Sequence, residues 1–150
     1  MSVREVYLLL HILSAMVWMG GSVMTHIFGA RAERSGDPAR TLGFAKDAAV
    51  AGRVLTVAGV SAGVWGILLV LDADVYDWEQ AWIVIGIFGV LVGALLGARF
   101  FAPQTRKLIV QLESGASEAA ATLRRIKLVG RVELIVLAVV LWAMVTKPGL

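Results

Sequence analysis

The stretch that decides the fold is VYLLLHILSAMVWMGGSVMTHIFGA, residues 6–30, which contains no Asp, Glu, Lys or Arg. A hydrocarbon core about 30 Å thick needs about 20 apolar residues at 1.5 Å each, so this stretch can cross a membrane as one helix. It is far longer than the apolar region of a secretory signal, and most of its flanking bases follow it. We therefore predict a retained transmembrane helix over residues 6–30.

Three further stretches of the same kind follow it in the chain. They occupy residues 50–71, 81–102 and 128–146, and they hold every other long apolar run. Hydrophobic residues make up 59% of the chain and charged residues only 17%, which is more apolar than a water-soluble domain. We therefore predict a single integral-membrane domain over residues 1–150, an all-α bundle of four up-and-down transmembrane helices.

The placement of the bases predicts how this bundle is oriented. Five Lys or Arg lie between Arg31 and Arg53 and seven between Arg99 and Arg131, so twelve of the fourteen flank the two longer connections. Bases mark cytoplasmic connections, so both termini are expected on the outer side of a bacterial-type cytoplasmic (inner) membrane. This placement indicates membrane lipid as a partner and no nucleic acid. The short middle connection carries only acids: Asp72, Asp74, Asp77 and Glu79.

The cytoplasmic connections carry helix-boundary residues. Asp37-Pro38 is typical of a helix start, so the second span is expected to begin inside the cytoplasm. Pro103 predicts a kink in the helix that continues beyond the third span, and residues 113–115 predict a turn. Ser117 is expected to be the N-cap of the helix that leads into the fourth span. The sequence therefore predicts helical extensions on the cytoplasmic side.

Glycine spacing predicts where the helices approach closely. Gly89, Gly93 and Gly97 form two overlapping GxxxG steps in the third span, and Gly20 and Gly21 lie at mid-membrane in the first. Small residues allow close backbone contact in lipid. The third-span glycines indicate tight packing inside one bundle or, alternatively, a homodimer through that face, and the first-span pair could admit another helix or a flat ligand.

Two histidines are the first candidates for chemistry within the spans. His11 and His26 are fifteen positions apart, about 22 Å along a helix, so they cannot bind one ion together. An uncharged His can bind haem iron or another metal, and His11 is the better candidate, with His26 a weak one beside the cytoplasmic surface. The alternative is that each His hydrogen-bonds another helix. The absence of Cys excludes thiolate-bound metal sites.

A second candidate site lies at the inner ends of the spans. There a simple bundle would bring together Arg53, Arg99 and Arg131 with Glu133, and His26 beside them. Such a basic pocket with one acid could hold anionic headgroups or the propionates of a porphyrin. The alternative is that these bases are ordinary flanking charges. Glu133 is the hardest to explain so, because an unpaired carboxylate within a span is costly.

The first span also resembles known families. His11, Trp18, Gly20 and Gly21 form the arrangement H-x6-W-x-G-G, which resembles the opening helix of copper resistance protein D and HemJ-type protoporphyrinogen oxidases. The ending Lys147-Pro148-Gly149 is also similar to the Lys-Pro ending of that group. The resemblance implies a four-helix membrane bundle in which His11 binds haem b. The HemJ-type oxidases also have a functional Lys within a later span, and no span here contains one.

Three functions are therefore considered, with enzymatic activity left open. The first is a membrane protein that binds haem b or a porphyrin and has a redox or electron-relay role. The second is a non-enzymatic scaffold or accessory subunit that binds another membrane protein. The third is transport of copper or a small solute along a path lined by His11, Met16, Met19 and Glu133, although copper would favour more His or Cys ligands.

Overall fold

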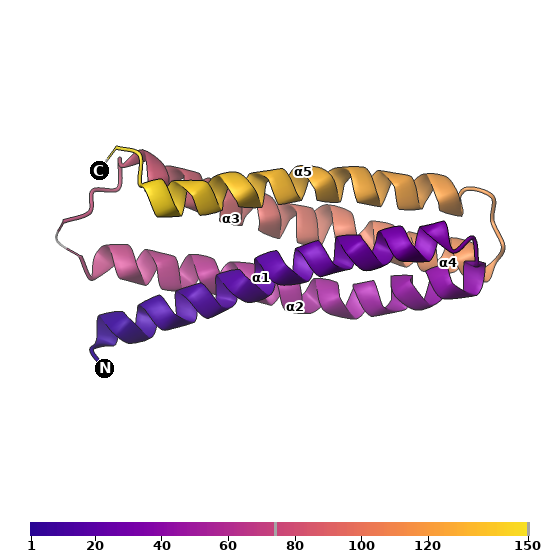
Figure 1. The fold of residues 1–150 in the computed structure, drawn as a ribbon, viewed down its shortest axis with the longest axis horizontal. Helices are drawn as coiled ribbons and strands as arrows, with labels where there is room; N and C mark the ends of the chain where they lie inside the picture. The colour runs from indigo at the N-terminus through magenta and orange to yellow at the C-terminus, as the bar shows by residue number, and fades with distance from the viewer. Residues whose placement is uncertain (74, 150) are drawn as a thin grey trace.

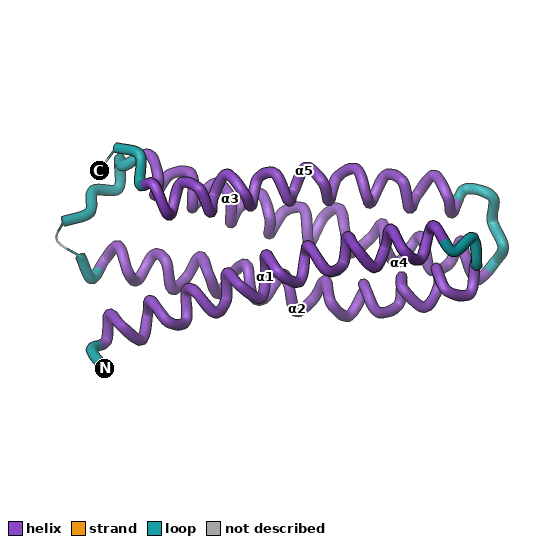
Figure 2. Tube along the Cα trace, in the orientation of Figure 1, coloured by secondary structure: helices purple, strands orange, loops and turns teal. Residues whose placement is uncertain are grey.

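Four long helical rods lie side by side in the computed structural model, which describes residues 1–73 and 75–149 (Figure 1). Asp74, one of the acids expected in the middle connection, lies outside the described residues. The described part contains no strand, and its loops lie at the two ends of the bundle (Figure 2). The predicted all-α four-helix architecture is confirmed. The elements are α1 (Val3–Arg34), α2 (Pro38–Leu71), α3 (Ala81–Leu95), the π-helix η1 (Leu96–Phe101), α4 (Ala102–Glu113) and α5 (Ala119–Thr146).

The first two helices begin at side-chain caps. The hydroxyl of Ser2 accepts a hydrogen bond from the Glu5 backbone N–H at 3.2 Å, and the Glu5 carboxylate accepts one from the Ser2 N–H at 2.8 Å. This reciprocal pair satisfies two backbone donors at the start of α1. The Asp37 carboxylate accepts from the Ala39 N–H at 2.9 Å, with Pro38 in the first helical position. The predicted start of α2 at Asp37-Pro38 is therefore confirmed.

The start of α5 differs from the prediction. The helix begins at Ala119, with Glu118 at the cap position and no side-chain cap, so the N-cap expected at Ser117 is wrong. Gly115, at φ +69°, reverses the chain, and the Ala119 N–H then bonds the Ala116 carbonyl across a turn that contains Ser117. Because this backbone turn leads into the helix, a Ser side chain is not needed to begin it.

The third rod is continuous but changes its winding before Pro103. In η1 the Ala102 N–H donates to the Gly97 carbonyl five residues earlier, which is π-helical spacing. Proline has no N–H to donate, so the α-helical ladder is interrupted at this point. A π segment is one of the ways in which a long helix bends. The distortion expected at Pro103 therefore takes this form, and α4 continues the rod into the cytoplasmic extension.

The third-span glycines face the inside of the bundle. A Cβ atom built at Gly93 or Gly89 would overlap Trp18 or Val140 respectively, and one at Gly97 would lie 2.8 Å from the Thr56 hydroxyl oxygen. Tight packing within one bundle is therefore confirmed. The chain's own side chains occupy the space beside Gly89, Gly93 and Gly97, and the homodimer through this face stays a prediction.

The buried core consists of small clusters at three levels rather than one large centre. Many large apolar side chains outside these clusters are exposed on the surface of the bundle, as expected where lipid is the solvent. The outer cluster contains Val70, Trp82, Ile83 and Ala143, the middle one Trp18, Ala58 and Leu137, and the cytoplasmic one Ala45, Leu108, Ala119 and Leu123.

Candidate functional site

A cavity of about 390 Å³ lies inside the bundle between the middle and cytoplasmic clusters. All four rods contribute to it, and many of its walls are Gly and Ala, whose small side chains leave space between the helices. Volumes of this size are typical of small-molecule sites. Its polar lining residues include Ser22, His26, Arg53, Arg106, Lys127 and Glu133.

Trp18 closes the outer end of this cavity. Its indole lies between α2 and α3, where a Cβ atom built at Gly59 would be 3.0 Å from Trp18 Cε2 and one built at Gly93 would overlap the same ring. The side chain is buried. The two glycines thus provide the space for one large aromatic side chain. Trp18 was singled out in the sequence as part of a candidate cofactor site, and in the structure its ring lies between the outer and inner halves of the bundle.

Glu133 extends from α5 toward the cavity just inside Trp18. The Trp18 indole N–H faces its carboxylate. The ion pairs among the described residues are Lys46–Glu113 and Lys127–Glu33, so Glu133 belongs to neither. A carboxylate inside a membrane bundle without a basic partner is a feature of functional sites.

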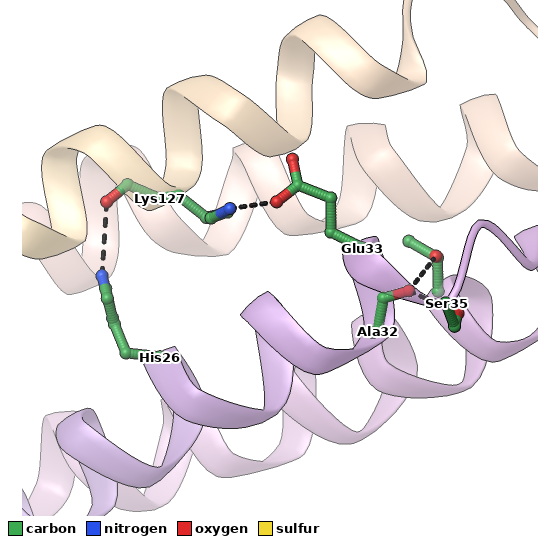
Figure 3. A network of polar contacts seen from close by, with 6 residues as sticks. His26, Ala32, Glu33, Ser35 and Lys127 are labelled. Carbon is green, nitrogen blue, oxygen red and sulfur yellow. Dashed lines mark hydrogen bonds and ion pairs between the residues drawn. The ribbon is translucent and has the colours of Figure 1, made fainter.

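His26 of α1 lines the cavity, and Figure 3 shows its ring facing the backbone of Lys127 on α5. Its Nε2–H donates to the Lys127 backbone carbonyl at 3.3 Å, and its ring packs against Gly130 of α5. The Lys127 ammonium in turn forms an ion pair with Glu33 of α1. These contacts join α1 to α5 at the mouth of the cavity.

His11, the leading ligand candidate, lies on the other side of Trp18. Its Nδ1–H donates to the Ala62 carbonyl at 2.8 Å, and its ring rests against α2 at Gly66. The carbonyl can only accept, so Nε2 keeps its lone pair, which is how metal-binding histidines are commonly oriented. His11 does not line the inner cavity.

The structure brings together part of the predicted basic pocket. Arg53, Glu133 and His26 line the cavity, whereas Arg99 and Arg131 do not. All three arginines are exposed, so the difference lies in the direction that each one faces. Residues on one helix turn to different faces every 100°, so bases at similar heights need not meet. Lys127 and Arg106 line the cavity instead. From the sequence, both were expected only to be basic residues of the cytoplasmic connection.

The remaining predicted residues also divide between inside and outside. Gly21 packs against Leu55 of α2, whereas a Cβ atom at Gly20 would meet nothing within 4 Å. Met16 is 65% exposed on the outer face of α1. With Trp18 between His11 and Glu133, the residues of the expected transport path do not line a common channel.

Lys147, from the Lys-Pro ending, ties the outer end of the bundle together. It has φ +44°, and its ammonium donates to the Tyr76 hydroxyl at 2.8 Å and lies 5.2 Å from the centre of the Trp82 ring. The hydrogen bond from Lys147 is the main reason why the pKa of Tyr76 is below its ordinary value, and the positive charges of Lys147 and Arg4 add to this. The contact joins the end of α5 to the connection before α3.

Four helices long and apolar enough to span a membrane, packed around an internal polar-lined cavity, define a polytopic α-helical membrane protein. The chain belongs to the family described as "Predicted integral membrane protein (DUF2269)", whose sequence pattern matches residues 5–148. No match was found among curated proteins or among solved structures.

Proposed function

We propose that this protein binds an amphipathic carboxylate, with haem b or a related porphyrin as the candidate, in the inner-half cavity. The proposal rests on one observation, the combination in a single cavity of small apolar walls with one imidazole and three basic side chains. The bases that would meet the carboxylates are Arg53 and Arg106, which take part in neither ion pair of the described residues, whereas Lys127 is paired with Glu33.

The cavity residues suit such a molecule chemically. A porphyrin has a flat apolar body, which the Gly and Ala walls can approach closely, and an acidic edge, which Arg matches with paired N–H donors. His26 supplies the one imidazole in the cavity wall. Bound haem would supply one-electron chemistry, whereas the chain's own residues bind the carboxylates, orient the ring and exclude water.

His11 provides a second candidate position on the outer side of Trp18. The observation that favours it is the 2.8 Å hydrogen bond from Nδ1 to the Ala62 carbonyl, which orients the ring and leaves Nε2 available. The resemblance of H-x6-W-x-G-G to HemJ-type oxidases and copper resistance protein D supports the same residue. The two positions make opposite predictions for the two histidines.

The test is the absorption spectrum of protein purified from haem-replete cells, with and without added haem. If the ligand lies in the inner cavity, His26→Ala shifts or removes the Soret band and Arg53→Gln weakens haem binding, whereas His11→Ala leaves the band unchanged. The reverse pattern for the two histidines assigns the ligand to the outer position. Exposed Arg99→Gln is the matched control for Arg53→Gln.

A colourless protein that also fails to bind added haem or iron-free protoporphyrin would overturn the proposal. If that preparation co-purifies with another membrane protein, the accessory-subunit alternative gains support. Binding of iron-free protoporphyrin that depends on Arg53, without haem in the purified protein, would retain the carboxylate site and remove the redox role.

A further inference from the structure

A second hollow, an open groove of about 950 Å³, runs along the outside of the bundle between α1 and α2, close to the turn that joins them. It shares Thr25, Phe44 and Ala48 with the wall of the inner cavity, but none of its charged lining residues. Toward the membrane it is lined by Met24 and Phe28, and toward the turn by Arg31, Arg34 and Arg40.

The apolar part of the groove extends unusually far toward the cytoplasm. Met24 is 45% exposed and Phe28 47% exposed. A Cβ atom built at Gly29 would lie 2.9 Å from Phe44, so this part of α1 is level with Phe44 of α2. Phe44 is nine residues before Arg53, or about 13 Å farther toward the turn. The outer face of α1 therefore stays apolar beyond the level of Arg53, and an exposed apolar surface of this kind favours an apolar neighbour such as an acyl chain.

The basic part of the groove has more positive than negative charge in its lining. Among the described residues the two ion pairs are Lys46–Glu113 and Lys127–Glu33, so none of Arg31, Arg34 and Arg40 takes part in one. Asp47 is the acid in the lining. Three guanidinium groups facing one carboxylate leave an excess of positive charge, and guanidinium groups match phosphate oxygens in geometry as well as charge.

We propose that this groove binds an anionic phospholipid of the cytoplasmic leaflet. The phosphate lies against Arg31, Arg34 and Arg40, and an acyl chain follows Met24 and Phe28 along α1. The basic part of the groove matches the phosphate of such a lipid, and the apolar part matches its acyl chain. Basic pockets between transmembrane helices on the cytoplasmic side are suited to anionic headgroups. The inference is independent of the proposed porphyrin site, because it uses none of that site's charged residues.

The test counts bound lipid on the purified full-length protein in a neutral detergent by native mass spectrometry, with dioleoyl phosphatidylglycerol as the probe. Replacing Arg31, Arg34 and Arg40 together with Gln should weaken binding at least tenfold, since each base near a membrane surface contributes measurably to the affinity. The matched control replaces Lys107, Arg124 and Arg125, which are exposed cytoplasmic bases, with Gln. It removes the same charge and should change binding less than twofold.

A second arm tests the apolar half without changing charge. Phe28→Ser should weaken phosphatidylglycerol binding severalfold and leave the weak binding of phosphatidylcholine unaltered, and it decides the matter if the Arg variant does not fold. Equal losses in the two Gln variants would mean general charge attraction and would overturn the proposal. Glycerol phosphate that binds as tightly as the whole lipid would also overturn it. The same holds if the Arg31, Arg34 and Arg40 variant loses a co-purifying acidic protein but still binds phosphatidylglycerol normally, because the groove would then bind a protein.

Discussion

Gly93→Ala is the sharpest test of how the bundle is packed. The added methyl would overlap the Trp18 ring, with Cη2 at 2.8 Å and Cε2 at 3.3 Å from the new carbon. Trp18 cannot move away freely, because Gly59 of α2 also lies close to its ring. A Cβ atom built at Gly59 would be only 3.0 Å from Trp18 Cε2. Overpacking of this kind costs about 1–3 kcal/mol, so we expect Gly93→Ala to lower the free energy of unfolding by that amount.

A double-mutant cycle with Trp18→Phe identifies the cause. Phenylalanine lacks the indole atoms that meet the new methyl, so Gly93→Ala should cost about 1–2 kcal/mol less in the Trp18→Phe background than alone. The intrinsic cost of Trp18→Phe cancels in the cycle. Helix loss in mixed micelles of dodecyl maltoside and dodecyl sulfate, followed by circular dichroism, measures each free energy.

Gly20→Ala is the control for the same change of residue in a position where a Cβ atom would meet nothing within 4 Å. We expect it to be neutral or stabilising by up to about 1 kcal/mol, because alanine favours the helix. Two results would refute this reasoning: Gly93→Ala is as harmless as Gly20→Ala, or its cost is the same with Phe at position 18. Either result would mean that the indole does not occupy the space between α2 and α3 and does not separate the outer half of the bundle from the inner half.

Three other predictions follow from the charged contacts and the topology. In a Tyr7→Phe background, ultraviolet titration should give Tyr76 a pKa below its ordinary value, and Lys147→Gln should raise it; the attraction between phenolate and ammonium stabilises the fold above that pKa and is lost as the pH falls through it. A double-mutant cycle on Glu33 and Lys127 should give a coupling of about 0.5–1 kcal/mol that falls in high salt, since both side chains are partly exposed; an unchanged value in salt would contradict this. Because the chain has no native Cys, single cysteines can be introduced: those in the termini and the middle connection should react with an impermeant reagent from one side of the membrane, and those in the two basic connections from the other.

The sequence predicted the fold well because its main determinants are local. An apolar run of sufficient length is a helix in lipid wherever it occurs, since no other arrangement satisfies its backbone groups. The Asp37-Pro38 start and the turn at residues 113–115 are likewise properties of neighbouring residues. The N-cap expected at Ser117 failed because a backbone turn after Gly115 begins the helix instead.

The candidate site could be predicted only in part, because it depends on the rotation of each helix. The level of Arg53, Arg99 and Arg131 follows from the chain, but which of them faces inward does not, and only Arg53 lines the cavity. Similarly, the spacing of Gly89, Gly93 and Gly97 indicates close packing, yet nothing in the pattern indicates that Trp18 fills the space between Gly93 and Gly59 of α2. The cavity walls of Gly and Ala thus come from the packing of helices that are distant in the sequence.

The position of Trp18 makes the interior of this protein one-sided. A molecule bound beside Glu133 would have the Trp18 ring between it and the His11 side of the bundle. If the cavity holds the proposed ligand, we therefore expect that ligand to enter and leave on the side of the basic connections and not to cross the bundle.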